Sequence, residues 1–158
     1  MGMEIERKFL IEKTQLPKDL ETYEHKEFEQ GYLCTNPVVR ARREGDDYVL
    51  TYKGGGLLKR EEYNLPLDHA SFSHLIQKAD GIIIKKTRYF LPLDETHTIE
   101  LDIFHDQLDG LMLAEIEFET EEEAKSYIVP EWFGREVTYE SAYHNSTISK
   151  CGMPADLN

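Results

Sequence analysis

The sequence predicts an α+β fold that is mainly β, in which eight antiparallel strands close into a barrel. In eight segments, apolar and polar or charged side chains alternate with a period of two residues, as in β-strands. Short turns separate most of these segments, which favours antiparallel hairpins, and eight strands are enough to close a barrel. The segments are residues 3–11, 25–34, 37–44, 47–53, 57–66, 82–92, 95–105 and 111–119.

Glycine, proline, asparagine and aspartate mark the turns between these segments. Asn36-Pro37, Gly45-Asp46-Asp47 and Gly54-Gly55-Gly56 bound the third and fourth strands. Pro92 to Glu95 and Asp106 to Gly110 flank the seventh strand. None of these turns is long enough to carry a crossover connection, so consecutive strands should lie side by side.

Two further segments carry helical patterns. Residues 68–79 begin at Asp68, a residue type favoured as an N-cap, and repeat apolar side chains at helical spacing. Gly81 is expected to terminate this helix. Residues 121–128 follow Thr120, and Glu123 stands three positions later, as in a capping box.

The chain length of 158 residues suits one domain over residues 1–158. Residues 139–150 form a weaker helical pattern, and we expect a loose tail at 152–158. Two cysteines are too few for a disulfide framework, and the N-terminal residues lack a basic-then-apolar signal. We therefore expect a cytoplasmic location.

The overall charge limits the partners. The chain has 18 Lys and Arg against 31 Asp and Glu, a formal charge of −13. Nucleic acids and anionic membranes both bind to positive fields, so general binding to either is not expected. No apolar run approaches the roughly 18 residues that a membrane span needs.

The charged residues of the strands predict which face of the sheet lies inside. Residues two apart share a face, and several charged faces carry a pair of one sign. The pairs are Arg40 and Arg42, Lys86 and Arg88, Glu100 and Asp102, and Glu115 and Glu117. Adjacent like charges repel, so a surface selected for stability tends to avoid them, although an ordinary sheet with a solvated charged face is the simpler alternative.

If the charged faces turn inward, the barrel encloses seven acids and seven bases. Burial of so many charges in a dry core would cost far too much free energy. The interior must then be wet or filled with ions, and its natural guest is a small polyanion with divalent metals. None of the six histidines pairs with a Ser or Cys in a triad order.

Sequence motifs point to a family. Glu4-Ile5-Glu6-Arg7-Lys8 matches an E-x-E-x-K signature. Further motifs follow in order along nearly the whole chain: Gly31-Tyr32-Leu33, Val39-Arg40-Ala41-Arg42, Thr51-Tyr52-Lys53-Gly54, Arg60-Glu61-Glu62, Lys86-Thr87-Arg88-Tyr89, Glu100 to Phe104, Ala114 to Glu117 and Gly134 to Thr138. The chain resembles the CYTH superfamily of triphosphate tunnel metalloenzymes, most closely its small bacterial inorganic triphosphatases. The resemblance implies a closed tunnel of eight antiparallel strands, with helices packed outside it and a C-terminal helix that plugs one end.

The resemblance also implies roles for the charged residues. Glu4, Glu6 and Glu117 are the expected ligands of a first Mg²⁺ or Mn²⁺. Asp102 and Glu115 are expected to hold a second metal or the attacking water, and the alternative is that they balance the charge of the cations. The expected triphosphate cradle is Lys8, which also counts as catalytic, with Arg40, Arg42, Lys53, Arg60, Lys86 and Arg88. Glu62 best fits a structural ion pair with the cations. Glu100 is expected to assist indirectly, through contacts with the residues that hold the second metal or the attacking water.

The implied activity is metal-dependent hydrolysis of inorganic tripolyphosphate to phosphate and pyrophosphate. The alternatives are a class IV adenylate cyclase, a thiamine or nucleoside triphosphatase, and a non-catalytic polyphosphate-binding protein. Two positions depart from the family pattern: Asn64 replaces an acid, and Ala142 replaces a basic residue of the plug helix. The oligomeric state is open, with a homodimer among the alternatives.

Overall fold

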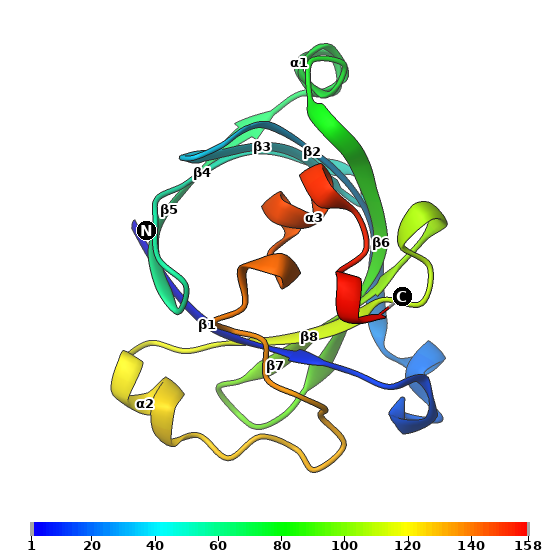
Figure 1. Cartoon of the computed structure of the whole chain (residues 1–158), viewed down its shortest axis with the longest axis vertical. Helices are drawn as coiled ribbons and strands as arrows, with labels where there is room; N and C mark the ends of the chain where they lie inside the picture. Colours follow the sequence, from blue (N-terminus) through cyan, green and yellow to red (C-terminus); the bar gives the residue numbers. More distant parts are fainter. Residues whose placement is uncertain (1, 158) are drawn as a thin grey trace.

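Eight antiparallel strands close into one barrel in the computed structural model, which describes residues 2–157. The order around the barrel is β1-β5-β4-β3-β2-β6-β7-β8, and β8 pairs back to β1 (Figure 1). The strands are β1 (Gly2–Leu10), β2 (Glu24–Thr35), β3 (Val38–Glu44), β4 (Asp47–Lys53), β5 (Lys59–Leu67), β6 (Asp80–Pro92), β7 (Thr98–Phe104) and β8 (Met112–Glu117). The predicted closed barrel is therefore confirmed, with strand ends that move by a few residues.

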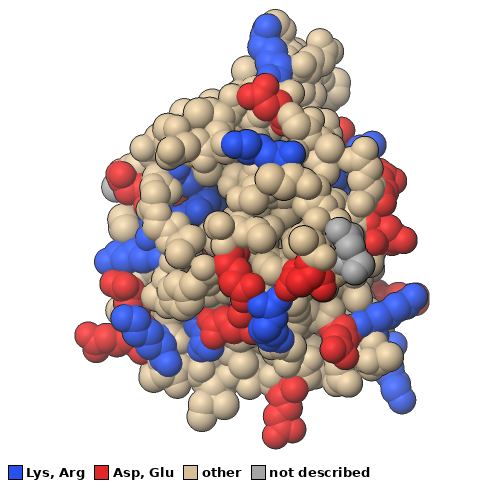
Figure 2. All heavy atoms as spheres, in the orientation of Figure 1, with Lys and Arg blue, Asp and Glu red and all other residues tan. Residues whose placement is uncertain are grey.

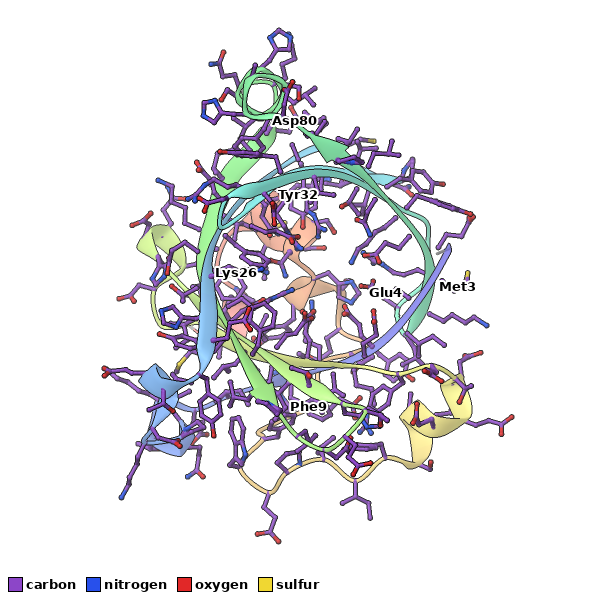
Figure 3. All side chains as sticks on the ribbon, turned by 180° about the vertical axis from the view of Figure 1, so that it is seen from behind. Met3, Glu4, Phe9, Lys26, Tyr32 and Asp80 are labelled. Atoms are coloured by element: carbon purple, nitrogen blue, oxygen red, sulfur yellow. The ribbon has the colours of Figure 1, made fainter. Side chains whose placement is uncertain are left out.

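β1 closes the barrel by changing its partner halfway along its length. Its first residues, up to Ile5, pair with β5, and its second half, from Glu6, pairs with β8. Successive side chains alternate between the two faces, so Glu4 points into the barrel and Met3 points outward (Figure 3). Glu4 is 8% exposed and Met3 is 52% exposed.

The helix α1 (His69–Ile76) covers the outer face of β2, β3 and β4. Asp68 accepts a hydrogen bond from the Ser71 amide, and the Ser71 hydroxyl accepts one from the Asp68 amide, which completes a capping box. The helix ends three residues before the predicted end. Gly81, expected to terminate it, instead lies in β6 with φ +69°, where a Cβ would meet the Ser149 carbonyl oxygen at 2.1 Å.

The helix α2 (Glu121–Ser126) forms only half of its predicted capping box. The Thr120 hydroxyl accepts a hydrogen bond from the Glu123 amide at 3.1 Å. The Glu123 carboxylate accepts a hydrogen bond from the Glu119 amide at 3.1 Å instead of one from the Thr120 amide. Ala124 is fully buried where α2 packs on β1.

The predicted helix over 139–150 is two pieces, the 3₁₀ helix η4 (Ser141–Tyr143) and α3 (Asn145–Cys151), joined at His144. Both lie within the ring of strands and plug one end of it (Figure 1). Tyr143 and Ile148 are buried there against apolar residues of β2 and β6. The plug therefore forms part of the hydrophobic core.

The remaining elements are short. They are the 3₁₀ helices η1 (Lys13–Gln15), η2 (Leu20–Thr22), η3 (Asp106–Leu108) and η5 (Ala155–Leu157). In the expected loose tail, Asp156 accepts hydrogen bonds from the Tyr143 hydroxyl and from Arg135. Among the helices that the structure describes, none has the length and apolar character to cross a bilayer.

Candidate active site inside the barrel

The charged strand faces turn into the barrel and enclose a cavity of about 60 Å³. Twelve of the charged residues singled out above line it: Glu4, Glu6, Lys8, Arg40, Arg42, Lys53, Arg60, Glu62, Lys86, Arg88, Glu100 and Glu115. A wider mouth of about 740 Å³ opens at the end opposite the plug, and Glu117 lies there, exposed. At the plugged end, basic side chains are visible in a hollow beside uncharged residues (Figure 2).

Arg88 is the most heavily paired cation. It lies opposite Asp102 in the register of β6 and β7, and its Nε and one terminal nitrogen donate to the two Asp102 oxygens at 2.7 and 2.8 Å. The same terminal nitrogen donates to Glu115 at 3.0 Å, and the other lies 3.4 Å from Glu100. These carboxylates hold the pKa of Arg88 above its ordinary value although burial opposes them.

Asp102 does not line the cavity, and it does not line the wider mouth. Its second oxygen also forms an ion pair with Lys86 Nζ at 2.7 Å, and the side chains of Asp102 and Lys86 are each 1% exposed. Burial raises the pKa of Asp102, but Arg88 and Lys86 outweigh burial and lower it. This geometry favours the charge-balancing role for Asp102 over direct contact with a metal or water.

Glu115 lines the cavity and is also ion-paired. Its carboxylate lies 3.3 Å from Lys8 Nζ and accepts from Arg88. Burial raises its pKa, but Lys8, Arg88 and further cations lower it well below the ordinary value. Glu115 is therefore ionised near neutral pH.

Lys53 joins the carboxylates of two other strands. Its Nζ lies 2.9 Å from Glu4 Oε1 and 3.6 Å from Glu62 Oε2. Burial raises the pKa of Glu4, but the charge and hydrogen bond of Lys53 lower it. Glu62 thus takes part in the structural ion pair expected for it.

Glu6 and Glu117, unlike Glu4 and Glu115, have no cationic partner within the described residues. They face each other directly in the register of β1 and β8. Burial and the neighbouring Glu115 and Glu4 raise the pKa of Glu6 well above its ordinary value. Burial and the carboxylates of Glu4 and Glu100 raise the pKa of Glu117 to about 7. The two carboxyl groups lack a counter-ion, so their protonated forms are favoured until a cation binds.

Arg40 is a cation without a carboxylate. It is 5% exposed, and one terminal nitrogen donates to the Thr51 hydroxyl at 3.1 Å. Its Nε is buried without a hydrogen-bond partner, and no salt bridge reaches it from the described part of the chain. Arg42, its neighbour on the same face, donates to Gln30 at 2.9 Å and to Glu44 at 3.1 Å. The cavity therefore presents donors that an anion could satisfy.

The donor set near Glu6 fits a hard divalent cation. Glu4, Glu6 and Glu117 offer only carboxylate oxygens, which Mg²⁺ and Mn²⁺ prefer, and the unneutralised charge of the last two favours a bound cation. Within residues 2–157, no three His, Cys, Asp or Glu side chains are gathered closely enough to enclose an ion.

Several neutral residues of the site carry no charge pattern and were not predicted. Gln30 and Thr51 bind the arginines of β3, and His144 and Asn145 contact Arg60 and Lys86 from the plug. Of the two departures from the family pattern, Asn64 accepts from the Thr51 hydroxyl at 2.6 Å, and Ala142 is exposed.

Comparison with known proteins places the chain in one family. The family model of the CYTH domain matches residues 2–151 of the sequence. A protein of Nitrosomonas europaea named inorganic triphosphatase is 38% identical over 149 residues, which cover 92% of this chain and 96% of that protein. A protein of Acetivibrio thermocellus with the same name is 35% identical over 95% of both chains. The crystal structure of an inorganic triphosphatase superposes with a TM-score of 0.67 at 36% identity, over 92% of this chain and 93% of the other.

Proposed function

The chain belongs to the CYTH domain family, and we propose that it is a metal-dependent triphosphatase that hydrolyses inorganic tripolyphosphate to phosphate and pyrophosphate. One observation of the structure carries the proposal. The buried guanidinium of Arg40 in the cavity has no anionic partner. The carboxyl groups of Glu6 in the cavity and Glu117 at its mouth have no cationic partner. A triphosphate with its divalent metal supplies both missing charges.

We propose that the cations of the cradle hold the phosphate oxygens. In phosphoryl transfer the protein mainly positions groups and stabilises charge on the equatorial oxygens. Arg40 and Arg42 of β3 can donate paired N–H groups to phosphate, and Lys8, Lys53 and Lys86 act as point charges. Arg88 contributes less directly, because three carboxylates already hold it.

We propose Glu4, Glu6 and Glu117 as the ligands of Mg²⁺ or Mn²⁺. When bound, the metal supplies positive charge for the phosphate oxygens. Glu115 is the carboxylate placed to orient the attacking water, since it lines the cavity and is ionised. Its low pKa makes it a weak base, so it orients water more than it accepts a proton. Asp102 positions Lys86 and Arg88.

The reaction adds water to the terminal phosphorus. A new P–O bond forms to the water oxygen, the bridging P–O bond breaks, and pyrophosphate leaves with the bridging oxygen; of the two water protons, one stays on the released phosphate and the other passes to solvent or to pyrophosphate. Lys8, 3.3 Å from Glu115, places a positive charge beside the water-orienting carboxylate. We further propose a cytoplasmic location and keep a homodimer as an alternative to a monomer.

Phosphate release from tripolyphosphate in Mg²⁺ or Mn²⁺ tests the proposal. We expect one phosphate per tripolyphosphate, with pyrophosphate left uncleaved. Glu6→Gln should lower turnover at least 100-fold, whereas Glu61→Gln, a matched change on the exposed outer face of the barrel, should not. Unchanged turnover in Glu6→Gln would refute the metal assignment.

ATP in the same assay distinguishes the alternatives. Cyclic AMP with pyrophosphate would indicate a cyclase, and free phosphate a hydrolase. Tight binding of tripolyphosphate without phosphate release would indicate a non-catalytic binding protein.

A further inference from the structure

Three consecutive residues of the plug each accept a hydrogen bond from a cation of a different strand. The Tyr143 carbonyl oxygen accepts from Lys8 Nζ of β1 at 3.2 Å. The Asn145 side-chain oxygen accepts from Lys86 Nζ of β6 at 3.2 Å. Between them, His144 Nδ1 lies 3.4 Å from a terminal nitrogen of Arg60 of β5. All three acceptors are neutral, so these contacts orient the cations without neutralising them; Lys8 and Lys86 also pair with Glu115 and Asp102, whereas Arg60 has no salt bridge within residues 2–157.

The ring of His144 is held in one tautomer by its other nitrogen. Nε2 lies 3.2 Å from the Thr138 carbonyl oxygen, which can only accept, so Nε2 carries the proton and Nδ1 presents a lone pair. Thr138 is itself fixed to β1, because its hydroxyl accepts from the Lys8 amide at 2.9 Å. Burial, and then the charge of Lys8, lower the pKa of His144 to about 4, so the ring is neutral near pH 7.

Arg60 depends on this contact more than Arg42 or Arg88 depends on any one partner. Arg42 and Arg88 each donate to a carboxylate. Within residues 2–157 Arg60 has no salt bridge, and its side chain makes no hydrogen bond other than that with His144. Arg60 also borders a second, small opening of about 160 Å³ between the Gly54–Gly56 turn and the plug. Arg60 thus lines both the cavity and this opening.

We propose that His144 is a positioning residue that holds Arg60 in the cavity as a phosphate-binding group. The imidazole supplies a neutral acceptor where a carboxylate would neutralise the guanidinium and repel the phosphate. His144, Tyr143 and Asn145 together orient Arg60, Lys8 and Lys86 at the plugged end of the barrel. These three cations would hold an unesterified phosphate group there. This inference rests on the proposed function, because it names a further determinant of the same site.

Three substitutions separate the two bonds of the imidazole. His144→Leu removes both, and we expect KM for tripolyphosphate to rise about 10-fold while kcat changes less than about twofold, since Arg60 binds substrate and transition state alike. His144→Asn keeps an oxygen near the Nδ1 position and should restore KM to within about threefold of the parent. His144→Gln keeps a polar atom near the Nε2 position and should resemble His144→Leu. Ser141→Ala, an exposed change in η4, is the control and should leave KM unchanged.

A double-substitution cycle tests whether His144 acts through Arg60. In an Arg60→Met background, His144→Leu should raise KM no further. Independent, multiplicative effects would overturn the proposal, as would a KM of His144→Leu equal to that of the parent, or a His144→Asn variant as impaired as His144→Leu. A loss of kcat alone would also count against it.

Failure of the proposed function is distinguishable from failure of this inference. If the parent protein releases no phosphate, the proposed function fails. The same variants are then compared by calorimetric titration of Mg²⁺ and tripolyphosphate. A 10-fold weaker Kd for His144→Leu, restored by His144→Asn, would still support the positioning role, and equal Kd values for all variants would refute it.

Discussion

The unpartnered Arg40 provides the sharpest test of the site. Replacement of Arg40 by Met removes a buried donor without a partner, whose burial costs about 1–3 kcal/mol. It also removes one hydrogen bond to Thr51, with a net contribution of about 1 kcal/mol. The free protein should therefore be as stable as the parent or more stable by about 0–2 kcal/mol, which corresponds to a melting temperature higher by up to about 8 °C.

Ligand affinity should change in the opposite direction. A hydrogen bond from a charged donor contributes about 1.5–3 kcal/mol, so the Arg40→Met variant should bind the anion roughly 10- to 150-fold more weakly. Thermal unfolding of the free protein gives the first quantity. Calorimetric titration with a non-hydrolysable imido analogue of tripolyphosphate in Mg²⁺ gives the second.

Arg88→Met is the matched comparison, because Arg88 is paired with three carboxylates. Its loss leaves buried carboxylates uncompensated and should destabilise the free protein by about 3–5 kcal/mol. If Arg40→Met destabilised the free protein as much as Arg88→Met and left affinity within twofold of the parent, Arg40 would be structural and the reasoning from unpaired charges would be refuted.

Four further outcomes are expected. Mg²⁺ or Mn²⁺ should raise the melting temperature of the parent and not that of Glu6→Gln, since the ion neutralises carboxylates that lack a counter-ion; equal shifts would place the ion elsewhere. The pKa of Glu117, raised from 4.5 to about 7, makes the folded state bind more protons than the unfolded state between these values, so the stability of the metal-free protein should fall as pH rises through this window, and less so for Glu117→Gln; identical pH profiles would contradict this. The lowered pKa values of Glu115 and Asp102 act in the opposite sense, so their stabilisation should be present above pH about 4.5 and lost on further acidification, with a shallower loss in Glu115→Gln, as monitored by circular dichroism. Gly81→Ala should destabilise the fold by more than 2 kcal/mol in urea unfolding, because its backbone is at φ +69° and a Cβ would meet Ser149; a loss below about 1 kcal/mol would mean that the plug shifts freely.

The alternation of the strands could be predicted from the sequence because it is a local property. The side-chain period of a strand is two, so Glu4 and Glu6 must share a face and Met3 must take the other. Like-charge pairs such as Arg40 and Arg42 then indicated that the charged face is functional. The Asp68 cap was also predicted, since its partner Ser71 lies three residues away.

Local patterns failed where a distant segment decided the outcome. The weak helix over 139–150 breaks at His144, which bonds to Arg60, 84 positions away in the chain. Gly81 was predicted to end a helix, yet its positive φ serves a close approach of the Ser149 backbone. In each case a tertiary contact determined a backbone conformation that the neighbouring residues left open.

The sequence by itself determined that these acids and bases face one another inside a closed barrel, and the E-x-E-x-K signature indicated their family. The tertiary structure alone decided which charges cancel. Strand register places Arg88 opposite Asp102 and Glu6 opposite Glu117, so one pair neutralises itself and the other does not. Coulomb energy depends on separation across strands, and no spacing within one strand encodes that separation.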